Sequence, residues 1–134
     1  MNILIVEDDA LSARRLKAMV TEMDHTFRVL DITESVRKTV DWLESHPTPD
    51  LMLMDIELTD GKSFEIFEQT TVKCPVIFVT AYDEYAIRAF KVNSIDYLLK
   101  PVKQEELAAS IEKLRQLQQQ YAQGSGGLNI QSLL

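Results

Sequence analysis

Short apolar runs alternate with helical patterns along most of this chain. The runs cover residues 2–6, 27–32, 50–54, 75–79 and 95–99. Each is short enough, and apolar enough, to be typical of a buried β-strand. Near-continuous apolar strands are buried on both faces, which is the pattern of a parallel sheet.

Apolar residues recur at helical spacing between these runs. In the first such segment Leu16, Met19, Val20 and Met23 share one face, and Asp9 is placed to cap its start. Further helices are expected after Ser35, which is placed to cap the helix that follows it, and over residues 62–71, 83–90 and 103–121. The stripes that predict them are Val36, Val40 and Leu43; Phe64 and Phe67; Ala86, Ile87 and Phe90; and Leu107, Ile111, Leu114, Leu117 and Tyr121.

Strand and helix alternate five times, which predicts βα units with helices on both faces of a parallel sheet. A length of 134 residues, 46% of them apolar, suits one domain. We expect that domain to span residues 1–122. Residues 123–134 contain a Gly/Ser stretch typical of a flexible linker and then an apolar restart. That restart fits either a further region that is missing here or a frayed tail.

Charge and composition exclude several classes of protein. A formal charge of −7 argues against a broad basic face for nucleic acid. No apolar run reaches membrane-spanning length, and no signal peptide precedes the first strand. A single cysteine rules out an internal disulfide and fits the cytoplasm.

Polar residues suited to one site end four of the predicted strands. These are Glu7 and Asp8, Asp55, Thr80 and Lys100. If the first, third, fourth and fifth strands are neighbours, these residues converge at one edge of the sheet. Each has a plainer explanation as a turn, a helix cap or a surface side chain, but their joint placement favours a site.

The residue types favour phosphoryl chemistry. Clustered carboxylates repel one another, and Mg²⁺ offsets that repulsion while it shares a phosphate. Asp55 can then act as a carboxylate nucleophile, while Thr80 and Lys100 stabilise charge on the phosphoryl oxygens. No Gly-rich phosphate loop is present, so nucleotide binding is poorly supported.

Four segments in this order resemble the receiver domain of two-component response regulators. They are ILIVEDD (3–9), LMLMDIEL (51–58), VIFVTA (76–81) and DYLLKP (96–101). The resemblance implies a flavodoxin-like (βα)5 fold with a five-stranded parallel sheet in the order 2-1-3-4-5. It also implies a signalling domain that a sensor histidine kinase phosphorylates, rather than an enzyme.

The resemblance assigns roles to individual residues. Asp55 would accept the phosphoryl group, and Thr80 and Lys100 would hold it. Mg²⁺ would be bound by Asp8 and Asp55, more loosely by Glu7, and by the backbone carbonyl of Glu57. Thr80 and Tyr97 would form the switch, and the Lys100–Pro101 peptide bond would be cis.

A narrower likeness lies in AYDEYA (81–86), in Ala89–Phe90 and in residues 93–101, which look like receivers of the LytTR class. It implies transcription regulation through a DNA-binding domain absent from this chain. The broader resemblance to receiver domains implies signalling through the helix at 83–90, the strand at 95–99 and the helix at 103–121, and homodimerisation through that face is a hypothesis. Ile87, Lys91 and Glu112 are the expected exposed positions.

Three alternatives stay open. The domain could act alone through protein contacts, or it could be a degenerate receiver that only binds a partner. The third is an aspartyl-phosphate phosphatase, because Asp55 to Thr59 faintly resembles the Asp-x-Asp-x-Thr start of haloacid-dehalogenase-type enzymes. In that case Glu57→Gln would destroy turnover of a phosphomonoester.

Overall fold

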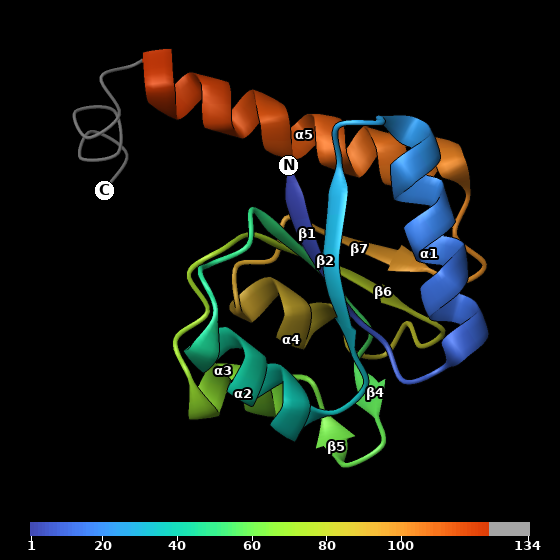
Figure 1. The fold of residues 1–134 in the computed structure, drawn as a ribbon, viewed down its shortest axis with the longest axis vertical. Helices are drawn as coiled ribbons and strands as arrows, with labels where there is room; N and C mark the ends of the chain where they lie inside the picture. Colours follow the sequence, from blue (N-terminus) through green and yellow to red (C-terminus); the bar gives the residue numbers. More distant parts are fainter. Residues whose placement is uncertain (124–134) are drawn as a thin grey trace.

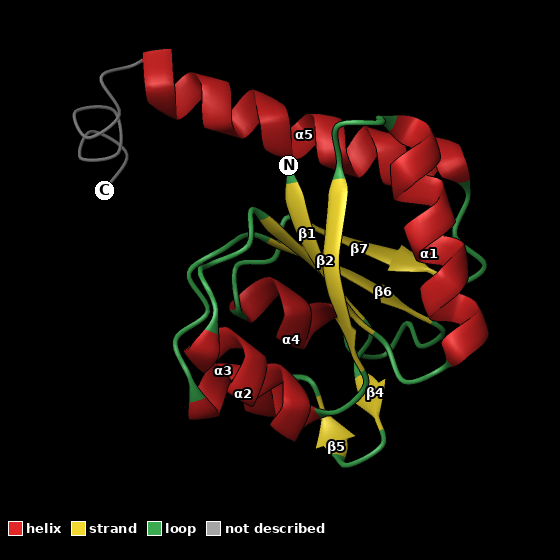
Figure 2. Cartoon of the chain, in the orientation of Figure 1, coloured by secondary structure: helices red, strands yellow, loops and turns green. Residues whose placement is uncertain are grey.

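A five-stranded parallel sheet with helices on both faces forms the body of the molecule (Figures 1 and 2). The computed structural model describes residues 1–123, so the expected linker at 124–134 lies outside the described residues. The strands are β1 (Asn2–Val6), β2 (Arg28–Thr33), β3 (Leu51–Met54), β6 (Val76–Thr80) and β7 (Asp96–Leu99). The helices are α1 (Ala10–Met23), α2 (Val36–Ser45), α3 (Phe64–Gln69), α4 (Ala86–Lys91) and α5 (Gln104–Gln123).

The strand order is β2-β1-β3-β6-β7, and every neighbouring pair is parallel. This is the predicted flavodoxin-like arrangement. The strands are in register at their carboxyl ends: Val6 pairs with Met54, and Met54 pairs with Phe78. Residues that follow these positions are therefore brought to one edge of the sheet.

Alternate residues of the strands build two hydrophobic clusters, one on each face. Ile3 and Ile5 of β1 face the cluster that α1 and α5 cover, whereas Leu4 and Val6 face the cluster under α2, α3 and α4 (Figure 1). None of the helices described in residues 1–123 has both the length and the apolar character needed to cross a bilayer.

The local caps form as predicted. The Asp9 side chain accepts a hydrogen bond from the backbone N–H of Ser12 at the start of α1, and the Ser35 side chain accepts one from Lys38 at the start of α2. The second strand begins one residue later than predicted, because Phe27 is tied by a turn to Asp24.

The expected helix over 62–71 is shorter, because its first residues belong to a small hairpin that the pattern did not predict. β4 (Glu57–Leu58) pairs antiparallel with β5 (Gly61–Lys62), so α3 starts only at Phe64. Within α3, Phe64 and Ile66 are buried. Phe67, expected inward, is only partly buried against the same cluster.

α4 departs most from its prediction. It begins at Ala86 instead of residue 83, and its buried residue is Ala89. Ile87 is 74% exposed, which confirms its expected exposure, and Phe90 of the same apolar stripe is 81% exposed. Lys91 and Glu112 are also exposed, as expected. In α5 the stripe is buried through Leu114, but Tyr121 is 50% exposed because the helix runs past the sheet (Figure 1).

Candidate functional site

Carboxylates from two neighbouring strands meet at the carboxyl edge of the sheet. Glu7 follows β1 and Asp55 follows β3, and the backbone N–H of Asp55 donates to the carbonyl of Val6 at 2.8 Å. Both acids are buried, with exposed fractions of 2% and 7%. Carboxylate oxygens of Glu7, Asp8 and Asp55 lie within 4.8 Å of one another. The predicted acidic cluster is therefore present.

Lys100 joins these acids from the end of β7. Its backbone N–H donates to the carbonyl of Thr80 at 2.8 Å, and the Lys100–Pro101 peptide bond is cis. Its Nζ lies 2.5 Å from Glu7 Oε1 and 2.9 Å from Asp55 Oδ2. One ammonium group thus bridges two buried carboxylates.

The remaining carboxylate oxygens bind backbone amides. Asp55 Oδ1 accepts from the N–H of Ile56 at 2.6 Å, and Glu7 Oε2 accepts from the N–H of Asp9 at 3.2 Å. Each buried acid therefore has both oxygens engaged, and the orientation of each side chain is fixed before any ligand binds.

The charges in this site do not balance. Burial raises the pKa of Glu7 to about 7, and the negative charge of Asp55 adds to that rise, while the hydrogen bond from Lys100 opposes it. Burial alone would lower the pKa of Lys100, but its hydrogen bonds to Glu7 and Asp55 outweigh this effect and raise it. Three carboxylates face a single ammonium group, so a further cation would relieve the repulsion.

Thr80 contributes a hydroxyl at the carboxyl end of β6, the strand that pairs with β3. It is the last residue of β6 and is fully buried, and Thr80 Oγ1 has no hydrogen-bond partner within residues 1–123. A buried hydroxyl without a partner is costly unless a ligand satisfies it.

The donor set suits a hard divalent cation. Mg²⁺ prefers oxygen ligands and is commonly bound through one or two carboxylates together with phosphate. Glu7, Asp8 and Asp55 supply carboxylate oxygens within 4.8 Å of one another. These residues fit a magnesium ion.

Glu57 has a side-chain partner that the sequence did not indicate. Its carboxylate accepts a hydrogen bond from the Tyr85 hydroxyl at 2.6 Å, and Lys62 Nζ lies 3.8 Å away. This bond raises the pKa of Tyr85 to about 12. The hydroxyl of Tyr97, the expected switch aromatic, donates to the carbonyl of Tyr82 in the loop before α4.

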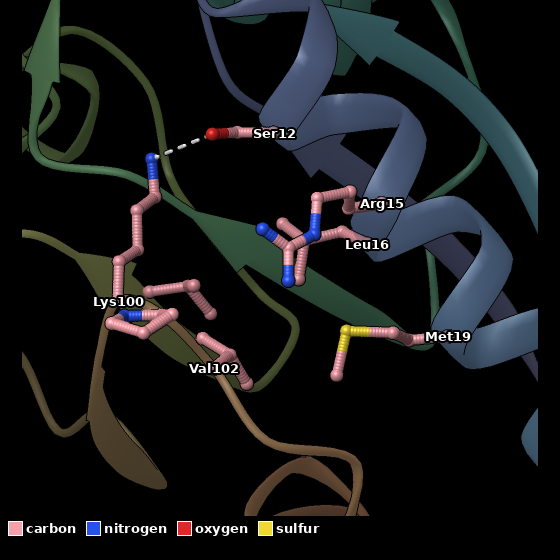
Figure 3. A pocket seen from close by; sticks show the side chains of 8 residues that line it. Ser12, Arg15, Leu16, Met19, Lys100 and Val102 are labelled. Carbon is pink, nitrogen blue, oxygen red and sulfur yellow. Dashed lines mark hydrogen bonds between the residues drawn. The ribbon is translucent and has the colours of Figure 1, made fainter.

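Two further contacts were not predicted, one at the site and one at the start of α2. Ser12 Oγ lies 3.5 Å from Lys100 Nζ (Figure 3), and its position three residues after the helix cap Asp9 could have indicated it. The carboxylate of Asp60 accepts hydrogen bonds from the first backbone N–H groups of α2, at Val36 and Arg37. That contact joins residues 23 and 24 apart, and no local pattern predicts it.

A small cavity of about 50 Å³ lies beside Lys100, between α1 and the loop that follows β7 (Figure 3). Leu16, Met19, Val79 and Val102 supply most of its apolar lining.

Two curated bacterial proteins illustrate what this chain is similar to. LytT, a sensory transduction protein of Enterococcus faecalis, is 38% identical over 116 residues, or 84% of this chain and 47% of that protein. The positive alginate biosynthesis regulatory protein of Pseudomonas aeruginosa is 36% identical over 116 residues, which are 84% of this chain and 46% of that protein. The chain thus spans about half the length of the curated relatives it matches.

Among solved structures, the response regulatory domain of mrkE from Klebsiella pneumoniae superposes with a TM-score of 0.79 at 23% identity, covering 90% of this chain and 99% of that one. This likeness shows the fold alone. The family described as the response regulator receiver domain matches residues 3–112, which include Glu7, Asp55 and Lys100. This chain therefore belongs to the response regulator receiver domain family.

Proposed function

We propose that Asp55 accepts a phosphoryl group from a sensor histidine kinase in a Mg²⁺-dependent reaction. The arrangement around Asp55 carries the proposal: a buried carboxylate is held by Lys100 Nζ and the Ile56 N–H. The neighbouring strand β6 ends at Thr80, whose buried hydroxyl has no hydrogen-bond partner within residues 1–123. Response regulators as a group are phosphorylated by histidine kinases, and receiver domains use Mg²⁺ at an acidic pocket.

In the reaction, a carboxylate oxygen of Asp55 attacks the phosphorus of a phosphohistidine. The new O–P bond forms as the P–N bond breaks, and the imidazole leaves with that electron pair and remains on the kinase. Lys100 and Thr80 would bind the phosphoryl oxygens and stabilise the charge they gain. Glu7, Asp8, Asp55 and the Glu57 carbonyl would hold Mg²⁺, which when bound neutralises charge on the phosphoryl oxygens.

The experiment is intact mass spectrometry after incubation with acetyl phosphate, with and without Mg²⁺. Wild type should gain one phosphoryl group only with the metal, and Asp55→Asn should gain none. Asp31→Asn, a change at an exposed aspartate of β2, is the control and should behave like wild type. Wild type that gains no mass under any condition would favour the degenerate receiver.

A phosphatase is the weaker alternative. That mechanism needs the second acid, Glu57, free to protonate a leaving group. Its carboxylate is instead engaged with the Tyr85 hydroxyl and lies near Lys62. Turnover of p-nitrophenyl phosphate by wild type, lost in Glu57→Gln, would revive this alternative.

We further propose that phosphorylation switches the face built from α4, β7 and α5, drawing Thr80 toward the phosphoryl group and turning Tyr97 inward. Homodimerisation through that face is supported by its exposed apolar side chains, Ile87, Phe90 and Leu99. Sedimentation should show a dimer only after phosphorylation, and Ile87→Asp should abolish it. A monomer in both states would contradict this part of the proposal.

The output would be transcription regulation in the cytoplasm, through a LytTR-type DNA-binding domain joined after residues 123–134. The support is the likeness to LytT and to the alginate regulator, together with the half-length coverage of both. A stand-alone receiver that acts by protein contact is the alternative. Sequencing the gene beyond the codon for Leu134 decides between them.

A further inference from the structure

The segment between β6 and α4 joins the candidate site to the exposed face of α4. It starts after Thr80, whose hydroxyl is buried and unpaired, and it leads into a helix of six residues with a single buried side chain, Ala89. So short a helix has little apolar contact of its own to hold it in place. Its position therefore depends strongly on contacts made by the residues around it.

Tyr85, the last residue before α4, makes such a contact with the loop that follows β3 and carries Asp55 and Glu57, here called the acceptor loop. Its hydroxyl donates to the Glu57 carboxylate at 2.6 Å, and Glu57 stands two residues after Asp55. Hydrogen bonds to an ionised acceptor are shorter and stronger than those between neutral groups. The bond thus links the start of α4 to the loop that carries the proposed phosphoacceptor.

The surroundings of Tyr85 hold its ring in the orientation that this bond requires. The ring packs edge-on against Phe64, with centroids 6.2 Å apart, and against Tyr82 at 6.1 Å. Lys62 Nζ lies 5.6 Å from the ring centroid. Removing the hydroxyl alone would leave these ring contacts in place, so the role of the bond can be tested separately from packing.

We propose that the Tyr85–Glu57 hydrogen bond holds the β6–α4 segment in its resting position, so that Tyr85 is a positioning residue that slows phosphoryl transfer to Asp55. This inference rests on the proposed function. If Thr80 must approach the acceptor to bind the phosphoryl group, the residues that follow it must move as well. A bond that fixes Tyr85 to the acceptor loop favours the resting arrangement. It therefore reduces the fraction of molecules in the arrangement that can accept the phosphoryl group.

Loss of this bond should change the electrostatics of the site less than it changes the freedom of the loop. The tyrosine hydroxyl is neutral, so its loss leaves the charge of Glu57 and the nearby Lys62 unchanged. The main consequence of the loss is greater freedom for the loop. The expected sign is therefore a faster reaction, not a slower one.

The test measures the rate at which the protein gains a phosphoryl group from phosphoramidate with Mg²⁺, by intact mass. Tyr85→Phe should react roughly tenfold faster than wild type. The backbone amides of residues 81–92 should also exchange hydrogen faster, while those of β1 and β3 should not change. Tyr121→Phe removes a hydroxyl from an exposed tyrosine on α5 and should match wild type in both measurements.

Glu57→Gln provides a second route to the same result, because it keeps an acceptor oxygen but removes the charge. It should react faster than wild type, and the double variant should be no faster than Tyr85→Phe alone. Wild type that gains no phosphoryl group would overturn the proposed function and this inference with it. If wild type reacts but Tyr85→Phe is unchanged or slower, the positioning role is wrong while the proposed function stands.

Discussion

The sheet beneath the site and the α4 segment (residues 81–92) are built in opposite ways. In β1, β3 and β6 every residue after Asn2 is buried, and the acids that follow β1 and β3 have both carboxylate oxygens engaged. In the α4 segment, by contrast, Ala89 is the only buried residue, and Ile87 and Phe90 are mostly exposed.

The contrast indicates that the two regions serve different roles in a signalling domain. A reactive carboxylate needs fixed neighbours, and the packed sheet supplies them. A reporting surface needs two arrangements of similar free energy, and a short helix with few buried contacts allows that. The contrast can be tested directly, because the two regions carry comparable residues.

Matched phenylalanine truncations should show the largest difference. Phe78 of β6 is fully buried and packs 5.5 Å from Phe64 and 6.3 Å from Tyr97, measured between ring centroids. Phe78→Ala should lower the free energy of unfolding by about 3–5 kcal/mol, because it leaves a cavity in the core. Phe90→Ala, at a side chain 81% exposed, should change it by less than about 0.5 kcal/mol.

Urea unfolding measures both variants. A similar loss in the two would mean that the α4 segment is as firmly packed as the sheet, and the contrast would fail.

The acidic cluster should make the metal-free protein sensitive to pH. The pKa of Glu7 is about 7 in the folded protein and has an ordinary value of 4.5. The folded state therefore binds this proton more tightly than the unfolded state does. The stability that Glu7 contributes is complete below about pH 4.5 and is lost as the pH rises toward 7.

Unfolding in EDTA at pH 5.5 and pH 8 tests this effect. Relative to Glu7→Gln, wild type should lose on the order of 1–3 kcal/mol between the two values. Added Mg²⁺ should restore stability at pH 8, because a ligand that binds only the folded state stabilises it. Identical pH profiles for wild type and the variant would show that burial of Glu7 is not costly.

The packed region is also the part that the sequence predicts best. Strand positions and the caps at Asp9 and Ser35 follow from local apolar patterns and local hydrogen bonding, whereas the sheet order was implied by the resemblance to receiver domains. The convergence of Glu7, Asp55 and Lys100 follows from sheet order, because parallel strands end at one edge.

The α4 segment was predicted only in part. Ile87 is exposed as expected for the signalling face, but an apolar stripe alone does not reveal whether Phe90, in the same stripe, meets a core or solvent, and Phe90 is 81% exposed. The bond between Tyr85 and Glu57 joins residues 28 apart. Its partners are chosen by tertiary packing, so no periodic pattern encodes it.

The smallest expected effect concerns how far the rigid region extends. Asp60, in the turn between β4 and β5, accepts hydrogen bonds from the N–H groups of Val36 at 2.7 Å and Arg37 at 3.0 Å. These amides start α2 and have no acceptor within the helix. Asp60→Ala should therefore cost about 1 kcal/mol of stability, as the loss of a helix cap does.

Its control is Asp41→Ala, at an exposed position on α2, which should cost less than about 0.5 kcal/mol.

Burial tends to raise the pKa of Asp60, but the hydrogen bonds from the amides of Arg37 and Val36 outweigh this effect and lower that pKa. The stabilisation is therefore present above the ordinary pKa and is lost as the pH falls through the lowered value, so the difference between Asp60→Ala and wild type should shrink in acid. If Asp60→Ala and Asp41→Ala have the same free energy of unfolding at neutral pH, the bonds between Asp60 and α2 do not stabilise the β4–β5 hairpin. The firmly packed region would then end at the sheet.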